Sequence, residues 1–112
     1  MSILTFAFWQ QKVEAYDFYC GTYNSGLNAY LMTETVRYRE AQDYAWIDCR
    51  VKAVQDSLVI YLDYNFEISS GGTISFTNSQ GFSGRFGGVL YRKGVIYPVE
   101  EKIFNVAYKY VK

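Results

Sequence analysis

The chain has 112 residues, with 11 lysines and arginines, 11 aspartates and glutamates and no histidine, so its formal net charge at pH 7 is zero. Half of its residues are hydrophobic, a composition that argues against intrinsic disorder, because such a chain can bury enough apolar surface to fold. A chain of this length supports one hydrophobic core but not two. We therefore expect a single domain over residues 1–112.

No run of hydrophobic residues is longer than the five at residues 58–62, far short of the ~20 residues that a membrane span requires. The first residues also lack the basic segment that opens a secretory signal peptide. These features predict a soluble, cytoplasmic protein with no membrane partner.

The absence of histidine narrows the possible chemistry. It removes the Ser-His-Asp and Cys-His systems, most catalytic zinc sites and the usual general base. Asp63 and Glu67 share one face of a predicted strand, but four residues of strand place them ~13 Å apart, too far for a retaining glycosidase pair. No phosphate-binding P-loop is present. The sequence therefore predicts a non-enzymatic protein with no cofactor and no metal site.

Cys20 and Cys49 form no Cys-x-x-Cys motif. In a reducing compartment, two such cysteines are expected to be small buried hydrophobic residues. A disulfide between neighbouring strands is the alternative, because the sequence does not reveal which strands are neighbours.

Residues 3–20 fit two templates. Apolar side chains alternate along residues 4–8 and again along residues 16–20, which predicts two strands. However, Phe6, Trp9, Val13 and Tyr16 fall at the spacings of three and four that are typical of a helix. The high aromatic content favours the strands.

The middle of the chain predicts a long hairpin. A turn at residues 24–26 precedes a strand over residues 27–38. Residues 44–53 and 58–68 then alternate with period two, and residues 58–68 place apolar side chains at every even position. The short connection at residues 55–57 joins these two strands as a hairpin.

The C-terminal half predicts shorter strands. Residues 69–72 form a turn before a strand at residues 73–77. Strands are also expected at residues 85–92 and 95–97, with Pro98 ending the second strand or placing it at an edge. The last strand is expected at residues 102–111, with these residues on one face: Phe104, Val106, Tyr108 and Tyr110.

Together these segments predict a mainly β fold. We expect a single-domain antiparallel sheet of about seven to eight strands, as a meander, a sandwich or a small barrel. A helix within residues 3–20 would make the fold α+β.

One face of the predicted hairpin carries the candidate binding residues. Tyr and Trp alternate there with charged side chains, a mixture that is typical of protein-binding surfaces. The candidates on this face are Tyr44, Trp46, Arg50, Tyr61 and Asp63.

The glycine-rich segment at residues 78–88 adds three more candidates, Phe82, Arg85 and Phe86. Phe and Arg anchor interfaces, and glycines make such a loop adaptable. The alternative is a long hairpin connection whose phenylalanines fold back onto the sheet, with Gly87 and Gly88 marking a bulge.

These residues predict a protein–protein interaction module of the inhibitor or immunity type. The alternative is a small-ligand-binding protein with a barrel-like fold. Nucleic acid is a poor candidate partner, because zero net charge and a pI near 6.2 lack the usual basic footprint. An exposed edge strand, near Pro98 or at residues 102–111, would also allow a homodimer.

Overall fold

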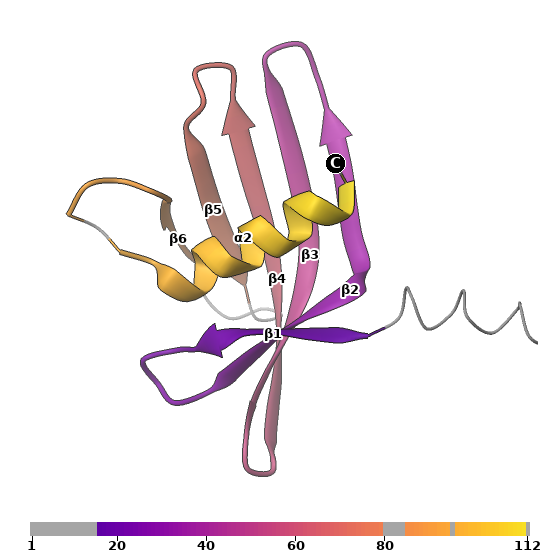
Figure 1. The fold of residues 1–112 in the computed structure, drawn as a ribbon, viewed down its shortest axis with the longest axis vertical. Coiled ribbons are helices and arrows are strands. Elements are labelled where there is room, and N and C mark those ends of the chain that lie inside the picture. The colour runs from indigo at the N-terminus through magenta and orange to yellow at the C-terminus, as the bar shows by residue number, and fades with distance from the viewer. Residues whose placement is uncertain (1–15, 80–84, 95, 112) are drawn as a thin grey trace, which may run out of the picture.

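The computed structural model describes residues 16–79, 85–94 and 96–111. These residues form six strands and one helix (Figure 1). The elements are β1 (Asp17–Thr22), β2 (Asn28–Glu40), β3 (Tyr44–Gln55), β4 (Leu58–Ser69), β5 (Ile74–Ser79), β6 (Arg85–Val89) and α2 (Pro98–Val111).

The six strands form one antiparallel sheet in which each strand pairs with its neighbours in the sequence. β1 and β6 are its two edges, so the sheet does not close into a barrel. The predicted fold class, mainly β with an antiparallel sheet, is confirmed, and of the three expected architectures the meander is the one observed.

The predicted central hairpin is confirmed. β3 and β4 pair without interruption from Tyr44 opposite Ser69 to Gln55 opposite Leu58, which leaves a two-residue turn. Asp56 occupies this turn with a φ of 55°, a left-handed conformation that Asp tolerates better than most residues. Because the turn sets the register, it also sets which side chains face each side of the sheet.

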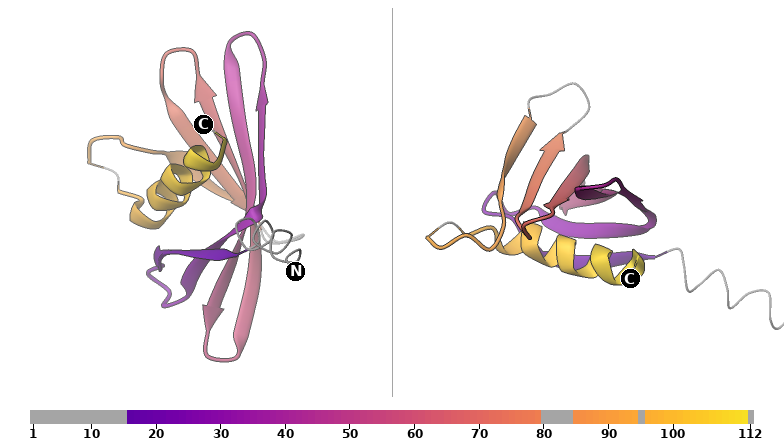
Figure 2. Two further views of the ribbon diagram at one scale, coloured as in Figure 1. Left: turned by 45° about the vertical axis from the view of Figure 1, so that its right-hand side comes forward. Right: turned by 90° about the horizontal axis from the view of Figure 1, so that it is seen from above.

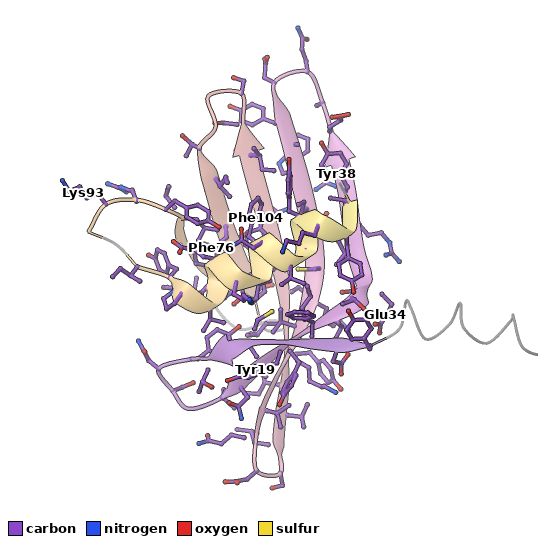
Figure 3. The ribbon with its side chains drawn as sticks, viewed as in Figure 1. Tyr19, Glu34, Tyr38, Phe76, Lys93 and Phe104 are labelled. Atoms are coloured by element: carbon purple, nitrogen blue, oxygen red, sulfur yellow. The ribbon has the colours of Figure 1, made fainter. Side chains whose placement is uncertain are left out.

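One face of the sheet packs against α2 (Figure 2). Odd positions of β3 and even positions of β4 point toward the helix, which follows from the two-residue period of a strand. The ring of Phe66 lies 5.4 Å from that of Phe104, edge to face. Phe76 of β5 and Phe104 of α2 are labelled in Figure 3, and both belong to this core.

The expectation of a strand at residues 102–111 is wrong, because this segment lies within α2. Pro98 suits the first position of a helix, and Glu100 and Glu101 place negative charge in the first turn, where the helix dipole favours it. The backbone N–H of Glu101 donates to the carbonyl of Tyr97 at 2.9 Å. Period-two alternation and helical spacing coincide over this segment, and the start signal at Pro98 distinguishes them.

Three other expectations for this half of the chain need correction. β6 ends at Val89 rather than at residue 92, and residues 96 and 97 are not in a strand. No bulge marks Gly87 and Gly88, since β5 and β6 pair in continuous register. An edge-strand dimer through residues 102–111 is also ruled out, because these residues are helical.

The described part of the N-terminal segment is a strand. Residues 17–20 belong to β1, as the strand template predicts, whereas residues 3–15 lie outside the described residues. The pairing of β1 with β2 shifts between Tyr19 and Gly21, where Gly21 has a φ of 119°. The predicted turn at residues 24–26 is confirmed, since the Gly26 N–H donates to the Tyr23 carbonyl.

A pair of alanine substitutions tests the helix. Ile103 is fully buried and Tyr108 is 39% exposed. We expect Ile103→Ala to lower the free energy of unfolding by about 2–5 kcal/mol and Tyr108→Ala by less than about 1 kcal/mol, as measured by urea denaturation. The reverse order would support a strand, in which Tyr108 faces the core and Ile103 faces solvent.

A second test concerns the close contact between β6 and the segment before α2. A Cβ atom at Gly88 would lie 2.5 Å from the Tyr97 hydroxyl oxygen. We expect Gly88→Ala to lower the free energy of unfolding by about 1–3 kcal/mol, because the ring must move. Gly71→Ala is the matched control, since its nearest neighbour is the Ser69 Oγ at 4.0 Å, and an equal loss in both variants would contradict this account.

Candidate functional site

The face of the sheet opposite α2 is the first candidate site. We call it the open face; it comprises the even positions of β3, the odd positions of β4 and the side chains paired beside them on β1, β2 and β5. In Figure 2, none of the described elements covers it. Its charged and aromatic side chains are therefore available to a partner as far as the described residues are concerned.

Ion pairs between strands order the charges of the open face. Arg50 Nε donates to Asp63 Oδ1 at 2.8 Å and a second guanidinium nitrogen reaches Asp63 Oδ2 at 3.4 Å. The register of the central hairpin causes this contact, because it places the two residues directly opposite each other. Two further pairs join Lys52 to Asp17 at 2.7 Å and Arg39 to Asp48 at 3.2 Å.

Trp46 lies within this network rather than outside it. Its indole N–H donates to Glu67 Oε1 at 3.1 Å. The Arg39 guanidinium lies 5.0 Å from the centre of the Trp46 ring, and Tyr44 stacks beside it at 6.0 Å. These contacts hold the half-buried indole in one orientation.

Tyrosines supply most of the exposed aromatic surface of the open face. Tyr19, Tyr44 and Tyr61 are 50%, 45% and 47% exposed. Arg50 lies 6.0 Å from the Tyr61 ring, which connects this tyrosine to the ion-pair network.

A shallow hollow of about 580 Å³ lies in the middle of the open face. Polar groups form much of its floor: Asn65 donates to Asp48 Oδ1 at 2.7 Å, and Arg50, Asp63 and Thr77 complete the lining from neighbouring strands. Most of these polar groups already have partners within the protein.

The structure brings five of the eight sequence-predicted residues together on the open face: Tyr44, Trp46, Arg50, Tyr61 and Asp63. Phe82 lies outside the described residues, and of Arg85 only the backbone, paired with Ser79, is described. Phe86 lies on the opposite face, where its ring is 5.8 Å from Phe76 and 6.0 Å from Tyr97. It is therefore not part of the same surface as Trp46.

A second concave site, which the sequence analysis missed, lies on the helix side of the sheet. We call it the helix-start groove; it has a volume of about 460 Å³ and lies between the β1–β2 loop, the central hairpin and the start of α2. Glu100 lines it and is only 7% exposed. Because no helix start was predicted at residues 98–101, no sequence pattern placed Glu100 beside the core.

Glu100 belongs to a buried polar cluster. The Tyr23 and Tyr64 hydroxyls are 2.7 Å apart. Burial raises the pKa of Glu100, although hydrogen bonds with its own backbone N–H and with Tyr64 partly oppose the shift. Burial also raises the pKa of Tyr23 and of Tyr64, so both hydroxyls stay protonated at neutral pH.

Cys20 and Cys49 are both free and buried, as the sequence analysis expected. They lie on β1 and β3, with β2 between them, so two strand spacings of about 4.8 Å separate them, beyond the reach of a disulfide. Burial raises the pKa of Cys20 to about 11 and also raises that of Cys49. Neither thiol is therefore activated for nucleophilic chemistry.

Comparisons with protein-family models, with curated proteins and with solved structures find no match. Among the described residues, no helix has the length and apolar character needed to cross a membrane. Over the same residues, no group of three or more acidic or cysteine side chains is placed to hold a metal ion.

The buried carboxyl of Glu100 makes a testable contribution to stability. Because burial raises its pKa above the ordinary value of about 4.5, the folded state favours the protonated form, and this contribution is lost as the pH rises above about 4.5. We expect Glu100→Gln to be more stable than the wild type at pH 7 and to lose that advantage below pH 4.5, as measured by thermal unfolding. An advantage that is the same at both pH values would contradict the assignment.

Proposed function

We propose that this chain is a non-enzymatic interaction module, of the inhibitor or immunity type, that binds another protein through the open face. The observation that carries the proposal is the arrangement of this face: exposed tyrosines lie next to an ordered network of charges, with none of the described elements covering them.

The pairing of charges favours a protein over a nucleic acid. Asp17, Asp48 and Asp63 each form an ion pair with a basic side chain of the same face. A phosphate backbone would meet these carboxylates as well as the basic groups, and nucleic-acid sites are instead predominantly basic. A protein surface of mixed charge can complement both signs.

The ordering of the side chains favours tight recognition. Exposed ion pairs contribute little to folding stability. Here they restrict long side chains such as Arg39 and Arg50 before any partner arrives. A face whose side chains are already ordered loses less conformational entropy on binding.

The aromatic residues would supply most of the binding energy. Tyr, Trp and Arg are the residue types that dominate interface energetics. Tyr61 stands beside the Arg50–Asp63 pair, and Tyr44 stacks on Trp46, so two aromatic groups flank the central polar region. We expect the partner to present apolar pockets at these two positions and polar groups between them.

The barrel-like container considered as an alternative has no support in the structure, because the sheet is open at β1 and β6. The hollow of the open face is shallow and rich in polar groups, whereas small-molecule sites are mostly apolar. A protein partner therefore fits the open face better than a small molecule does.

Substitutions on the two faces of the sheet test the proposal. Wild-type protein would be used to capture partners from native lysate, and each candidate's affinity would be measured by calorimetry. We expect Tyr61→Ala to weaken the partner at least tenfold, which corresponds to about 1.4 kcal/mol of binding energy, in the range of interface hot spots. Tyr108→Ala, on the opposite side in α2, is the control and should leave the affinity unchanged.

A charge reversal adds a second, independent test of the same face. The double variant Arg50→Asp with Asp63→Arg keeps an ion pair in place but exchanges the two charges. We expect normal unfolding behaviour together with loss of partner binding. If Tyr61→Ala and the exchanged pair both bind as the wild type does while Tyr108→Ala does not, the open face is not the interface.

A further inference from the structure

We propose that the helix-start groove binds a small amphipathic primary amine, with its protonated amino group at Glu100 and its apolar body along the groove wall. This inference does not depend on the proposed function, because the groove lies on the opposite face of the sheet from Trp46 and Tyr61.

The size and the lining of the groove suit a small organic molecule. Its volume of about 460 Å³ lies within the range of sites that bury small ligands. Apolar side chains from the β1–β2 loop, the central hairpin, β6 and the segment before α2 form its walls. They include Leu27, Ile60, Leu62, Phe86 and Ile96.

The charge of the groove selects the ligand class. Among the described residues that line it, Glu100 carries the only charge. The Glu100 residue is almost entirely buried, and the ion pairs of the described residues do not include it. A buried carboxylate without a counter-ion is costly, so a cationic group delivered by a ligand would relieve that cost.

The hydrogen bonds of the cluster point to a donor-rich head group. A carboxylate accepts up to about four hydrogen bonds, and the backbone N–H of Glu100 and the Tyr64 hydroxyl contribute to those of Glu100. A primary ammonium brings three donors, whereas an alcohol brings one and a carboxylate none. The remaining acceptor positions of Glu100 therefore favour an amine over an alcohol and disfavour an acid.

The start of α2 fixes the backbone position of Glu100. Glu100 lies in the first turn of the helix, two residues after Pro98. The start of the helix packs closely on β1, since a Cβ at Gly21 would meet Val99 Cγ2 at 3.4 Å. The start of the helix, and with it the backbone of Glu100, is thus held in place before a ligand binds.

Three probes of nearly equal shape test the proposal on the wild-type chain: 2-phenylethylamine, 2-phenylethanol and 3-phenylpropanoate. Calorimetry would give their affinities, and amide chemical shifts in NMR spectra would locate them. We expect the amine to bind at least tenfold more tightly than the alcohol, with no binding of the acid. The shifts should concentrate at Tyr23, Leu27 and Val99, and not at Trp46.

Two matched variants separate Glu100 from general charge effects. Glu100→Gln should reduce the affinity for the amine to that for the alcohol. Glu101→Gln removes the same charge from the neighbouring residue, whose carboxylate accepts a hydrogen bond from the Tyr91 N–H. This variant should bind the amine as the wild type does. The amide spectra of both variants would show whether each is folded.

Several results would overturn the proposal. The first two are equal affinities for the amine and the alcohol, and the absence of any binding to the wild type. The other two are amide chemical-shift changes that cluster at the acids of the open face, and an equal loss of amine affinity in Glu100→Gln and Glu101→Gln. Because the three probes are compared on the wild-type chain, the proposal is tested even if a variant fails to fold. If the open face were shown to bind no protein, these measurements and their interpretation would not change.

Discussion

The burial of one face of the β3–β4 hairpin beneath α2 is the packing interaction on which the rest of the structure depends. Val51 and Phe66 are fully buried on this face, and Phe66 meets Phe104 of the helix edge to face. Since successive side chains of a strand point to opposite sides, burying this set necessarily directs the alternate set away from the helix. The polar, aromatic character of the open face is thus a direct consequence of how the core is formed.

The two candidate sites differ in kind because they arise differently. The open face is a product of strand register, which pairs Arg50 with Asp63 and Trp46 with Glu67 across the hairpin. The helix-start groove is a product of tertiary packing, since it forms where α2 begins beside a loop and two strands. One site offers an extended surface of paired charges, and the other offers an apolar recess with a single buried carboxyl group.

Much of the fold could be predicted from local sequence patterns, and the failures have identifiable physical causes. The period-two alternation of residues 58–68 was enough to place Tyr61 and Asp63 on one face, because side-chain direction within a strand is a local property. The side chain of Phe86 could not be placed this way, since its face depends on how β6 pairs with β5, opposite Asn78. Residues 102–111 satisfy both helical and strand spacing, and only Pro98 and the acids after it distinguish the two. Missing the helix also hid the buried position of Glu100, because burial there is created by contacts between distant segments.

The pairing of charges on the open face has a further consequence for how a partner would arrive. Asp17, Asp48 and Asp63 are each neutralised by a nearby base, so the electric field of this face decays within a short distance of the surface. Long-range attraction would then add little to the rate of encounter, which should stay near the ordinary range of about 10⁵–10⁶ M⁻¹ s⁻¹ and respond weakly to ionic strength. Selectivity on such a surface comes from the lifetime of the complex rather than from the speed of its formation.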